Sequence, residues 1–416
     1  MLEKDWLSEL ATQAELADLL APSTECQEAA GYGHTLAEIC QQPHTWLQTA
    51  DGLIEARAWL QDWMDGVQWL VLTGSGSSQY VGECVHPVLQ PEMGRPVVTL
   101  GGGWLLIDGA RCVPPARPGL LVSLARSGDS PESVGVVEAF LEAEPLIKHL
   151  VITCNPQGRL AMDFTGDRRV RRLTLDSRTN DRSLVMTSSF TNMAIASRAL
   201  SLLGDAEAIR RLADQLARAA RSILLRYADV LAAVARAPFK KAVFLGTGCQ
   251  FGAAKESALK MLEMNSGRIP TVAETFLGLR HGPMCGVDRD TLAVCFLSSD
   301  PLARAYEEDL LAELNRKDLG ARKLLIGAEI RPALLTGGDV AVRIPEMAAA
   351  GDVNSPVLAV LVGQLLAFFR CRAEGLRPDN PSTGAISRVV NGFPIYREKS
   401  AKENAVHPGL KPWAAD

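Results

Sequence analysis

Short apolar runs alternate with amphipathic stretches through most of the chain, and this pattern predicts its architecture. Four such runs, at residues 67–72, 119–124, 149–154 and 241–245, have the length of buried strands. Apolar strands that alternate with helical stretches indicate a parallel sheet covered by helices on both faces. The expected fold class is therefore α/β.

The second half of the chain repeats the first at a constant spacing. Gly74 and Gly76 follow the first run, and Gly246 and Gly248 follow its counterpart 172 residues later. Ser127, after the next run, corresponds to Ser299 at the same spacing. A constant offset across two strand-and-loop units predicts a duplicated α/β domain.

Helical patterning flanks and joins the two copies. Residues 1–65 are mainly helical in pattern, and residues 205–237 carry one apolar stripe. We expect two tandem domains, each a mainly parallel sheet flanked by helices, with N-terminal helices and an extended C-terminal tail that closes over the site. The expected segments are 1–50 (N-terminal helices), 51–204 (first domain), 205–239 (helical connector), 240–376 (second domain) and 377–416 (tail).

Composition narrows the function classes that suit such domains. The 416 residues are 22% charged, the formal net charge is −5, and there is no basic block. A mildly acidic chain of this kind is a poor partner for nucleic acid or an anionic membrane surface. An anionic substrate must therefore be held by local dipoles and a few placed charges.

The cysteines and the N-terminus indicate the compartment. Nine cysteines are scattered singly, which favours reduced thiols over a disulfide framework or a zinc site. Residues 1–5 lack the layout of a signal peptide, and no uninterrupted apolar run approaches the ~18 residues of a membrane span. We expect a soluble cytoplasmic protein without a metal or other cofactor.

Two loops at the ends of neighbouring expected strands are candidates for holding a phosphate. Residues 73–78 (TGSGSS) lie between a strand and a helix start, and residues 125–133 (ARSGDSPES) repeat this design, with Ser130 as N-cap. The N–H groups and dipole of a helix N-terminus favour an anion. Each loop alone is equally well explained as a capped helix start. Together, at the edge where open α/β sheets bind ligands, they favour a phosphate site.

The corresponding loop of the second domain differs. At the constant offset, Asp300 replaces Gly128. Because a carboxylate would repel a phosphate, we expect the second domain to have kept the fold and lost the anion site.

One helix and one irregular segment carry candidate chemistry. Glu256, Lys260 and Glu263 share a helix face at i, i+4 and i+7. This face is either a solvated charge cluster or a carboxylate base beside an ammonium, which suits proton transfer next to a carbonyl. His281 precedes Gly-Pro, so its imidazole lies on an irregular segment where it can act as acid or base. Asp181, with Thr187 and Ser188, forms a further polar cluster that either completes a phosphate or sugar site or caps a helix.

Taken together, these segments resemble the sugar isomerase (SIS) domain family, specifically its two-domain members. Residues 35–43, 244–250, 258–263 and 280–283 are similar to motifs in the isomerase half of glucosamine-6-phosphate synthase. A second set of motifs is similar to the branch of tagatose-6-phosphate ketose/aldose isomerases and galactosamine-6-phosphate deaminases. These motifs are residues 125–133 (ARSGDSPES), 186–191 (MTSSFT), 276–283 (FLGLRHGP) and 388–392 (RVVNG).

The resemblance implies a role for each candidate residue. It makes Glu263 the proton shuttle between C1 and C2, next to Lys260, and makes His281 the group that opens the sugar ring, reaching the site of a neighbouring subunit. Arg388 stands where the synthase has a tail lysine, and an arginine clamps an anion better than it moves a proton. The phosphate would be held by Ser77, Ser78, Ser127 and Ser130, assisted by Thr187 or Ser188.

The implied function is an amino-sugar-phosphate deaminase/isomerase. Galactosamine 6-phosphate would become tagatose 6-phosphate and ammonia by C2-to-C1 proton transfer, with hydrolysis of a ketimine, so that isomerase, deaminase and hydrolase classes are all expected. The alternatives are an aldose–ketose isomerase without deamination and a non-catalytic sugar-phosphate sensor. The partners implied are a small sugar phosphate and a second copy of the chain in a homodimer.

Overall fold

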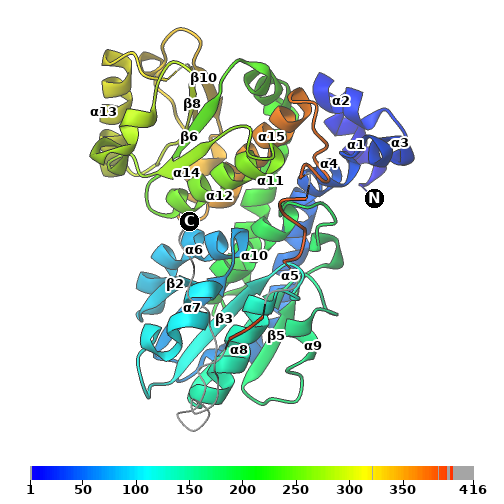
Figure 1. Cartoon of the computed structure of the whole chain (residues 1–416), viewed down its shortest axis with the longest axis vertical. Coiled ribbons are helices and arrows are strands. Elements are labelled where there is room, and N and C mark those ends of the chain that lie inside the picture. Colours follow the sequence, from blue (N-terminus) through cyan, green and yellow to red (C-terminus); the bar gives the residue numbers. More distant parts are fainter. Residues whose placement is uncertain (1, 321, 383, 391–393, 397–416) are drawn as a thin grey trace, which may run out of the picture.

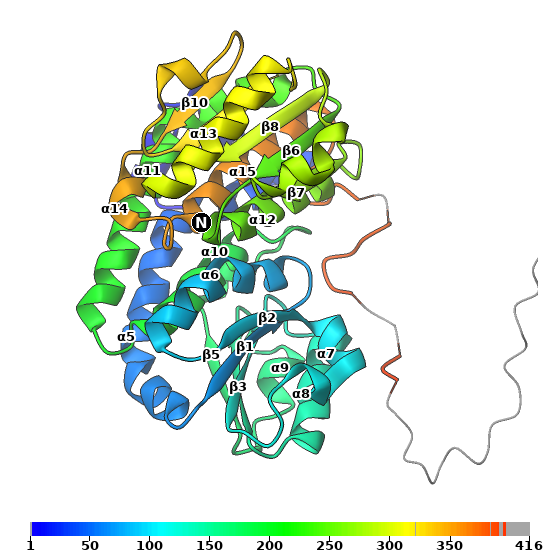
Figure 2. The same cartoon turned by 90° about the vertical axis from the view of Figure 1, so that its left-hand side faces the viewer.

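The computed structural model describes residues 2–320, 322–382, 384–390 and 394–396. Two α/β units lie one above the other along the long axis, and the N-terminal helices flank the upper unit (Figure 1). Figure 2 shows the described part of the tail passing from the second unit to the first. The remaining tail residues, 383, 391–393 and 397–416, lie outside the described part of the chain.

Each unit contains one five-stranded parallel sheet. The strand order is β2-β1-β3-β4-β5 in the first sheet and β7-β6-β8-β9-β10 in the second, so the two topologies are the same. The expected α/β class and duplicated domain are confirmed. The strands are β1 (Trp69–Gly74), β2 (Val97–Gly101), β3 (Gly119–Ala125), β4 (Ile147–Thr153), β5 (Val170–Thr174), β6 (Lys241–Leu245), β7 (Thr271–Glu274), β8 (Thr291–Phe296), β9 (Arg322–Gly327) and β10 (Val340–Arg343).

Helices cover both faces of each sheet. The N-terminal group is followed by α5, whose N-terminal turn holds Pro43, and the expected boundary at residue 50 falls inside this helix. The helices are α1 (Lys4–Leu10), α2 (Ala14–Leu20), α3 (Thr24–Ala30), α4 (Gly33–Cys40), α5 (Gln42–Met64), α6 (Ser77–Met93), α7 (Gly102–Asp108), α8 (Pro131–Ala143), α9 (Arg159–Met162), α10 (Ser188–Arg198), α11 (Ala206–Arg236), α12 (Cys249–Met264), α13 (Pro301–Arg316), α14 (Glu346–Ala350) and α15 (Pro356–Ala373).

Alternating side chains of the central strands fill two separate cores. In β1, Leu70 and Leu72 belong to a large core shared by both units, whereas Trp69 and Val71 face a smaller cluster beneath α7 and α8. This alternation follows from the two-residue period of a strand. The central strands are buried on both faces, which explains their continuous apolar runs.

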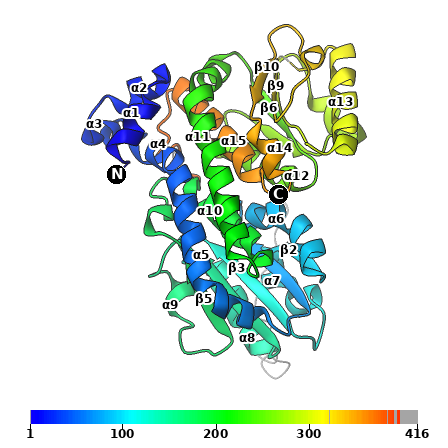
Figure 3. The same ribbon diagram turned by 180° about the vertical axis from the view of Figure 1, so that it is seen from behind.

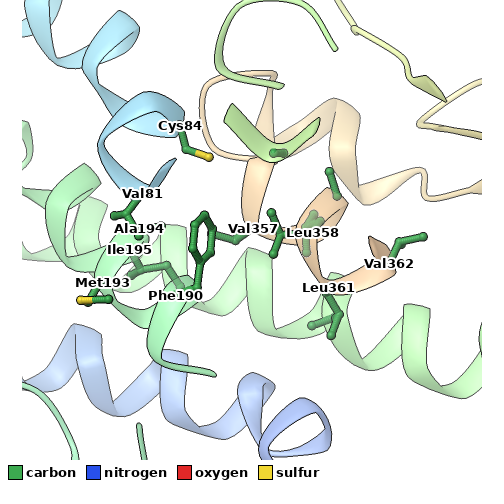
Figure 4. Packing of buried hydrophobic residues seen from close by; sticks show 14 of the residues in the cluster. Val81, Cys84, Phe190, Met193, Ala194, Ile195, Val357, Leu358, Leu361 and Val362 are labelled. Carbon is green, nitrogen blue, oxygen red and sulfur yellow. The ribbon is translucent and has the colours of Figure 1, made fainter. Parts of the chain in front are cut away.

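The shared core joins the two units into one body. Helices α6, α10 and α15 interdigitate there, and Figure 4 shows Phe190 lying between Ile195 and Val357 among other apolar side chains. Helices α5 and α11 lie side by side along the back of the molecule (Figure 3). The sites at the ends of the two sheets are therefore held in a fixed relation by continuous packing.

Helix α15 is long and apolar enough, by length and composition, to cross a membrane. Its window is 89% buried inside the protein, where it packs against α11 and α12. That burial is the one expected of a core helix in a soluble protein.

Candidate functional site

The two candidate phosphate loops lie side by side. Strands β1 and β3 pair in parallel register from Trp69↔Gly119 to Thr73↔Ser123, so the loops that follow them meet at one edge of the sheet. Gly76, with φ +58°, turns the chain into α6, a backbone angle that favours glycine. Ser77 and Ser78 are buried in the first turn of that helix.

Lys260 and its two carboxylates come to this edge from the second unit. Lys260, on α12, is 1% exposed, and its Nζ donates to Ser77 Oγ at 3.0 Å and to Glu263 Oε2 at 2.5 Å. Glu256 Oε1 lies 3.4 Å from the same Nζ and is fully buried. The charged face predicted from the sequence is therefore an internal cluster where the two units meet, not a solvated surface.

Burial sets the protonation of this cluster. Burial raises the pKa of Glu256 to about 8, although Lys260 opposes the shift. Burial alone would lower the pKa of Lys260, but Glu256 and Glu263 raise it above its ordinary value. Near pH 7 the ammonium thus pairs mainly with Glu263, whose side chain is 24% exposed and can meet a substrate.

The second phosphate loop leads into the N-terminus of α8, and two of its serines make hydrogen bonds within the loop and the first helical turn. Ser127 Oγ accepts from the backbone N–H of Asp129 at 3.3 Å, and Ser130 Oγ donates to Glu132 Oε2 at 3.3 Å. Ser130 occupies the N-cap position of α8, as the sequence predicted, but its hydroxyl bonds to Glu132 and makes no capping hydrogen bond within the described residues. Ser78 Oγ has only a long contact, 3.9 Å, to the Met186 sulfur. The hydroxyls of Ser77 and Ser130 thus already have charged partners, Lys260 and Glu132, whereas Ser78 and Ser127 make weaker contacts.

The polar cluster before α10 is centred on Asp181. Its carboxylate accepts from the Thr187 N–H at 2.8 Å, from the Ser188 hydroxyl, and from both donors of Ser189. Asp181 therefore caps α10, and the Ser188 hydroxyl is already bonded to it. The Thr187 hydroxyl, by contrast, is fully buried and has no hydrogen-bond partner in the described part of the chain.

The tail reaches this cluster through Arg388. Its guanidinium donates to the Asp181 carbonyl at 2.8 Å and to Asn180 Oδ1 at 2.7 Å. Within the described residues its bonds are thus to protein oxygens. The tail is also fixed upstream by Asp379, whose carboxylate accepts from the N–H groups of His34 and Thr35 at the start of α4.

His281 is not bonded to the Lys260 cluster in the described part of the chain. It is exposed at the end of a 3₁₀ turn, Gly278–His281, that follows the edge strand β7. Among the described residues, no hydrogen bond or ion pair connects it to Lys260 or Glu263.

The equivalent loop of the second unit is filled by a carboxylate. Asp352 accepts from the Ser298 hydroxyl and from the N–H of Ser299 at 2.7 Å. Asp300 caps α13 by accepting from Leu302 and Ala303 N–H groups. Helices α8 and α13 start at residues 131 and 301, so Asp300 is structurally equivalent to Ser130, not to Gly128 as the constant offset implied. Counted from the strand starts at residues 119 and 291, the helix begins two residues sooner in the second unit, and this shifts the correspondence.

Sequence reasoning missed three residues of the site. Arg126 is 7% exposed and precedes Ser127 directly, but an arginine in a loop gave no signal of burial. Ser75 has a buried hydroxyl without a partner among the described residues, in the same Gly/Ser loop that was identified. Glu256 was seen on the helix face but was not assigned to the site; its i−4 spacing from Lys260 was the available signal.

Comparisons with known proteins give close relatives. No family model matches the chain. An AgaS protein of Streptomyces coelicolor, whose D-galactosamine-6-phosphate deaminase name is provisional, is 40% identical over 374 residues, covering 87% of this chain and 95% of that protein. The D-galactosamine-6-phosphate deaminase AgaS of Escherichia coli is 33% identical over 371 residues, with the same two shares covered. The solved structure of tagatose-6-phosphate ketose/aldose isomerase from Escherichia coli has a TM-score of 0.80 and 31% identity, covering 88% of this chain and 97% of that one.

These names correct one expectation. The relatives are deaminases and an isomerase, so the hydrolase class expected from ketimine hydrolysis is wrong.

Proposed function

Because this chain belongs to the AgaS family of two-domain SIS proteins, we propose that it converts galactosamine 6-phosphate to tagatose 6-phosphate and ammonia. The observation that carries the proposal is the Lys260–Glu263 pair at the junction of the two units. It places a partly exposed carboxylate and a buried ammonium beside the first turn of α6, where Ser77 lies.

The phosphate would be held at the paired loop ends. The N-termini of α6 and α8 provide backbone N–H groups and a favourable dipole. Ser77, Ser78, Ser127 and Ser130 add hydroxyl donors, and the unpartnered hydroxyl of Thr187 is a further candidate. Ser188 would act indirectly, because Asp181 already holds its hydroxyl.

Glu263 would move the proton from C2 to C1. A carboxylate that accepts from Lys260 is held in one position, and general-base catalysis by a placed group contributes roughly 10²–10⁴-fold. Lys260 would stabilise negative charge as the enolamine forms. The ketimine produced from a 2-amino sugar then loses ammonia to water.

His281 would open the sugar ring in the site of a partner subunit. Its exposure in the single chain, and the lack of a hydrogen bond or ion pair to Lys260 or Glu263 among the described residues, support this assignment. We accordingly propose a homodimer, working in the cytoplasm, with no requirement for nucleic acid or membrane. Arg388 would order the tail beside the site without moving a proton.

A second candidate function is aldose–ketose isomerisation of tagatose 6-phosphate without deamination. It is favoured by the similarity to the Escherichia coli ketose/aldose isomerase. The same proton shuttle serves both reactions, because only the substituent at C2 differs.

The test is ammonia release from galactosamine 6-phosphate and, separately, from glucosamine 6-phosphate. We expect rapid release from the galacto compound, and a loss of about 10³-fold in turnover for Glu263→Gln with hexose-phosphate binding retained. Glu55→Gln, on the exposed side of α5, is the matched control and should match the wild type. No ammonia from either sugar, with tagatose 6-phosphate isomerised, would favour the second candidate.

A further inference from the structure

Arg126 joins three segments that are far apart in the sequence. One nitrogen of its guanidinium donates to the carbonyls of Ser183 at 3.1 Å and Leu184 at 3.0 Å, and the other donates to the carbonyl of Arg388 at 2.5 Å. The residue itself begins the loop that follows β3 and precedes Ser127 directly. A single buried side chain thus contacts the phosphate loop, the segment that leads to α10, and the tail.

Only a guanidinium has the geometry to donate to all three carbonyls at once. Arginine presents five N–H donors in a planar fork, whereas a lysine ammonium is a compact point charge. A buried charge bonded only to carbonyls also depends on each of them, because an unmet donor there is costly. Arg126→Lys therefore keeps the charge and loses the simultaneous bridge.

The tail contacts the same segment. Arg388 donates to the Asp181 carbonyl and to Asn180, while its own carbonyl accepts from Arg126. Both arginines are therefore bonded to residues 180–184. Glu38 also accepts from the N–H groups of Arg182 and Ser183 in that segment.

From these contacts we infer that Arg126 is a positioning residue, which couples the seating of the C-terminal tail to the phosphate loop Ser127–Ser130. The inference rests on the proposed function only for the identity of the substrate. When the loop is ordered by a phosphate, Arg126 is fixed and holds residue 388 in place. When Arg126 cannot bridge, the tail leaves the site and the loop loses a support.

Limited proteolysis tests the coupling without relying on turnover. Trypsin cleaves after Arg388, and mass spectrometry distinguishes the fragment 1–388 from cleavage further along the tail. We expect Arg126→Lys to release this fragment at least about ten-fold faster than the wild type, as is typical when a local opening becomes easier by roughly 1.4 kcal/mol. Inorganic phosphate should slow the cleavage in the wild type and not in the variant.

Arg182→Lys is the matched control. Its side chain is 73% exposed in the same segment, so the cleavage rate should be that of the wild type. Equal rates for Arg126→Lys and Arg182→Lys would overturn the inference, whatever substrate the enzyme uses. Failure of the proposed function shows separately, as absence of turnover by the wild type.

Kinetics provides a second route if Arg126→Lys folds poorly. Arg388→Ala removes the tail's side-chain contacts to Asn180 and Asp181. Arg126→Lys and Arg388→Ala should each raise KM about ten-fold. The kcat of each should change less than about three-fold, because Glu263 and Lys260 stay in place. In a double-mutant cycle the combined variant should lose little more than the worse single one. Independent, multiplying effects, or an unchanged KM for Arg388→Ala, would show that the two arginines are not coupled through the tail.

Discussion

At the scale of single residues, the cluster on α12 combines one ammonium with two carboxylates of different exposure. Glu256 is fully buried and Glu263 is 24% exposed, although the two lie two turns apart on one helix. Desolvation favours the neutral form of a buried acid. The two glutamates therefore divide the work: Glu256 is a mainly neutral neighbour near pH 7, and Glu263 is the charged partner of Lys260.

The raised pKa of Glu256 predicts a pH-dependent contribution to stability. The pKa is about 8 in the folded protein against an ordinary 4.5, so the folded state binds the extra proton between these values. The contribution of Glu256 to the free energy of unfolding is therefore fully present below pH 4.5 and is lost as the pH rises towards 8. Glu256→Gln cannot titrate, so its stability relative to the wild type should rise by about 4 kcal/mol from pH 5 to pH 8.5, which is about 1.4 kcal/mol for each pH unit between 5 and 8.

Urea unfolding at the two pH values measures this difference. Glu38 titrates in the same range, but it is present in both proteins and cancels from the comparison. A difference between variant and wild type that is the same at pH 5 and pH 8.5 would contradict the assignment of Glu256 as a buried neutral acid.

The unpartnered hydroxyl of Thr187 gives a second prediction at this scale. Thr187→Val keeps the side-chain shape and removes a buried hydroxyl that has no hydrogen-bond partner among the described residues. The free energy of unfolding should therefore be unchanged or higher by about 1 kcal/mol. If the hydroxyl binds the substrate phosphate, KM should rise about ten-fold, as for a lost hydrogen bond to a charged group. Steady-state kinetics and thermal unfolding separate these effects.

Ser188→Ala serves as the contrast, because its hydroxyl donates to Asp181 instead. That variant should lose stability with a smaller change in KM. An unchanged KM for Thr187→Val would remove Thr187 from the phosphate site.

At the scale of elements, helix starts are held by carboxylates that come from elsewhere in the chain. Asp181 caps α10, and Asp379, from the tail, caps α4 through His34 and Thr35. Both satisfy N–H groups that a helix N-terminus leaves free. In the Asp379 case the bond also anchors the tail to the N-terminal helices before it crosses to Arg388.

Loss of this cap should weaken the molecule measurably. Asp379→Ala removes acceptors from the backbone N–H groups of His34 and Thr35, and also from the Thr35 hydroxyl. We expect the free energy of unfolding to fall by about 1–2 kcal/mol, as for other N-cap deletions. Chemical denaturation provides the value, with Ser23→Ala, the cap of the exposed helix α3, as a control expected to lose less. A loss no larger than that control would show that the tail is not anchored at α4.

Central and edge strands differ in how far the sequence predicted them. The runs at 67–72, 119–124, 149–154 and 241–245 became β1, β3, β4 and β6, because burial on both faces leaves an unbroken apolar pattern. The edge strands β2, β5, β7 and β10 are partly exposed, and their polar positions hide the signal.

At the scale of the whole molecule, the repeat predicted the duplication but not how the site is shared. Equivalent elements start 172 residues apart, as predicted. This holds for β1 and β6, for α6 and α12, and for β3 and β8. The Lys260–Ser77 contact, however, joins the two copies, and nothing in a linear pattern states which helix of one unit meets which loop of the other. The roles of Arg126 and Asp352 could not be predicted for the same reason, because the residues that they bond are distant in the sequence.

The two copies are related closely enough to compare their junctions position by position. An ion pair between Glu83 and Lys255 joins residues that are themselves 172 apart, so equivalent helices α6 and α12 face each other. The positions equivalent to Lys260 and Ser77 are Val88 and Cys249, both buried. The second junction thus lacks both the ammonium and the hydroxyl.

This asymmetry predicts one substrate site per chain. In the second unit the anion-binding loop already holds the Asp352 carboxylate, which would have to leave before a phosphate could enter. No base stands opposite, since Pro91 replaces Glu263 in the equivalent position. The Glu263→Gln protein should bind galactosamine 6-phosphate without turning it over. Isothermal titration calorimetry of this variant should give a stoichiometry of about one sugar phosphate per chain. A value near two would mean that Asp352 yields to the ligand. In that case Asp352→Asn, which cannot repel a phosphate as a carboxylate does, should tighten the second, weaker binding event and leave the first unchanged.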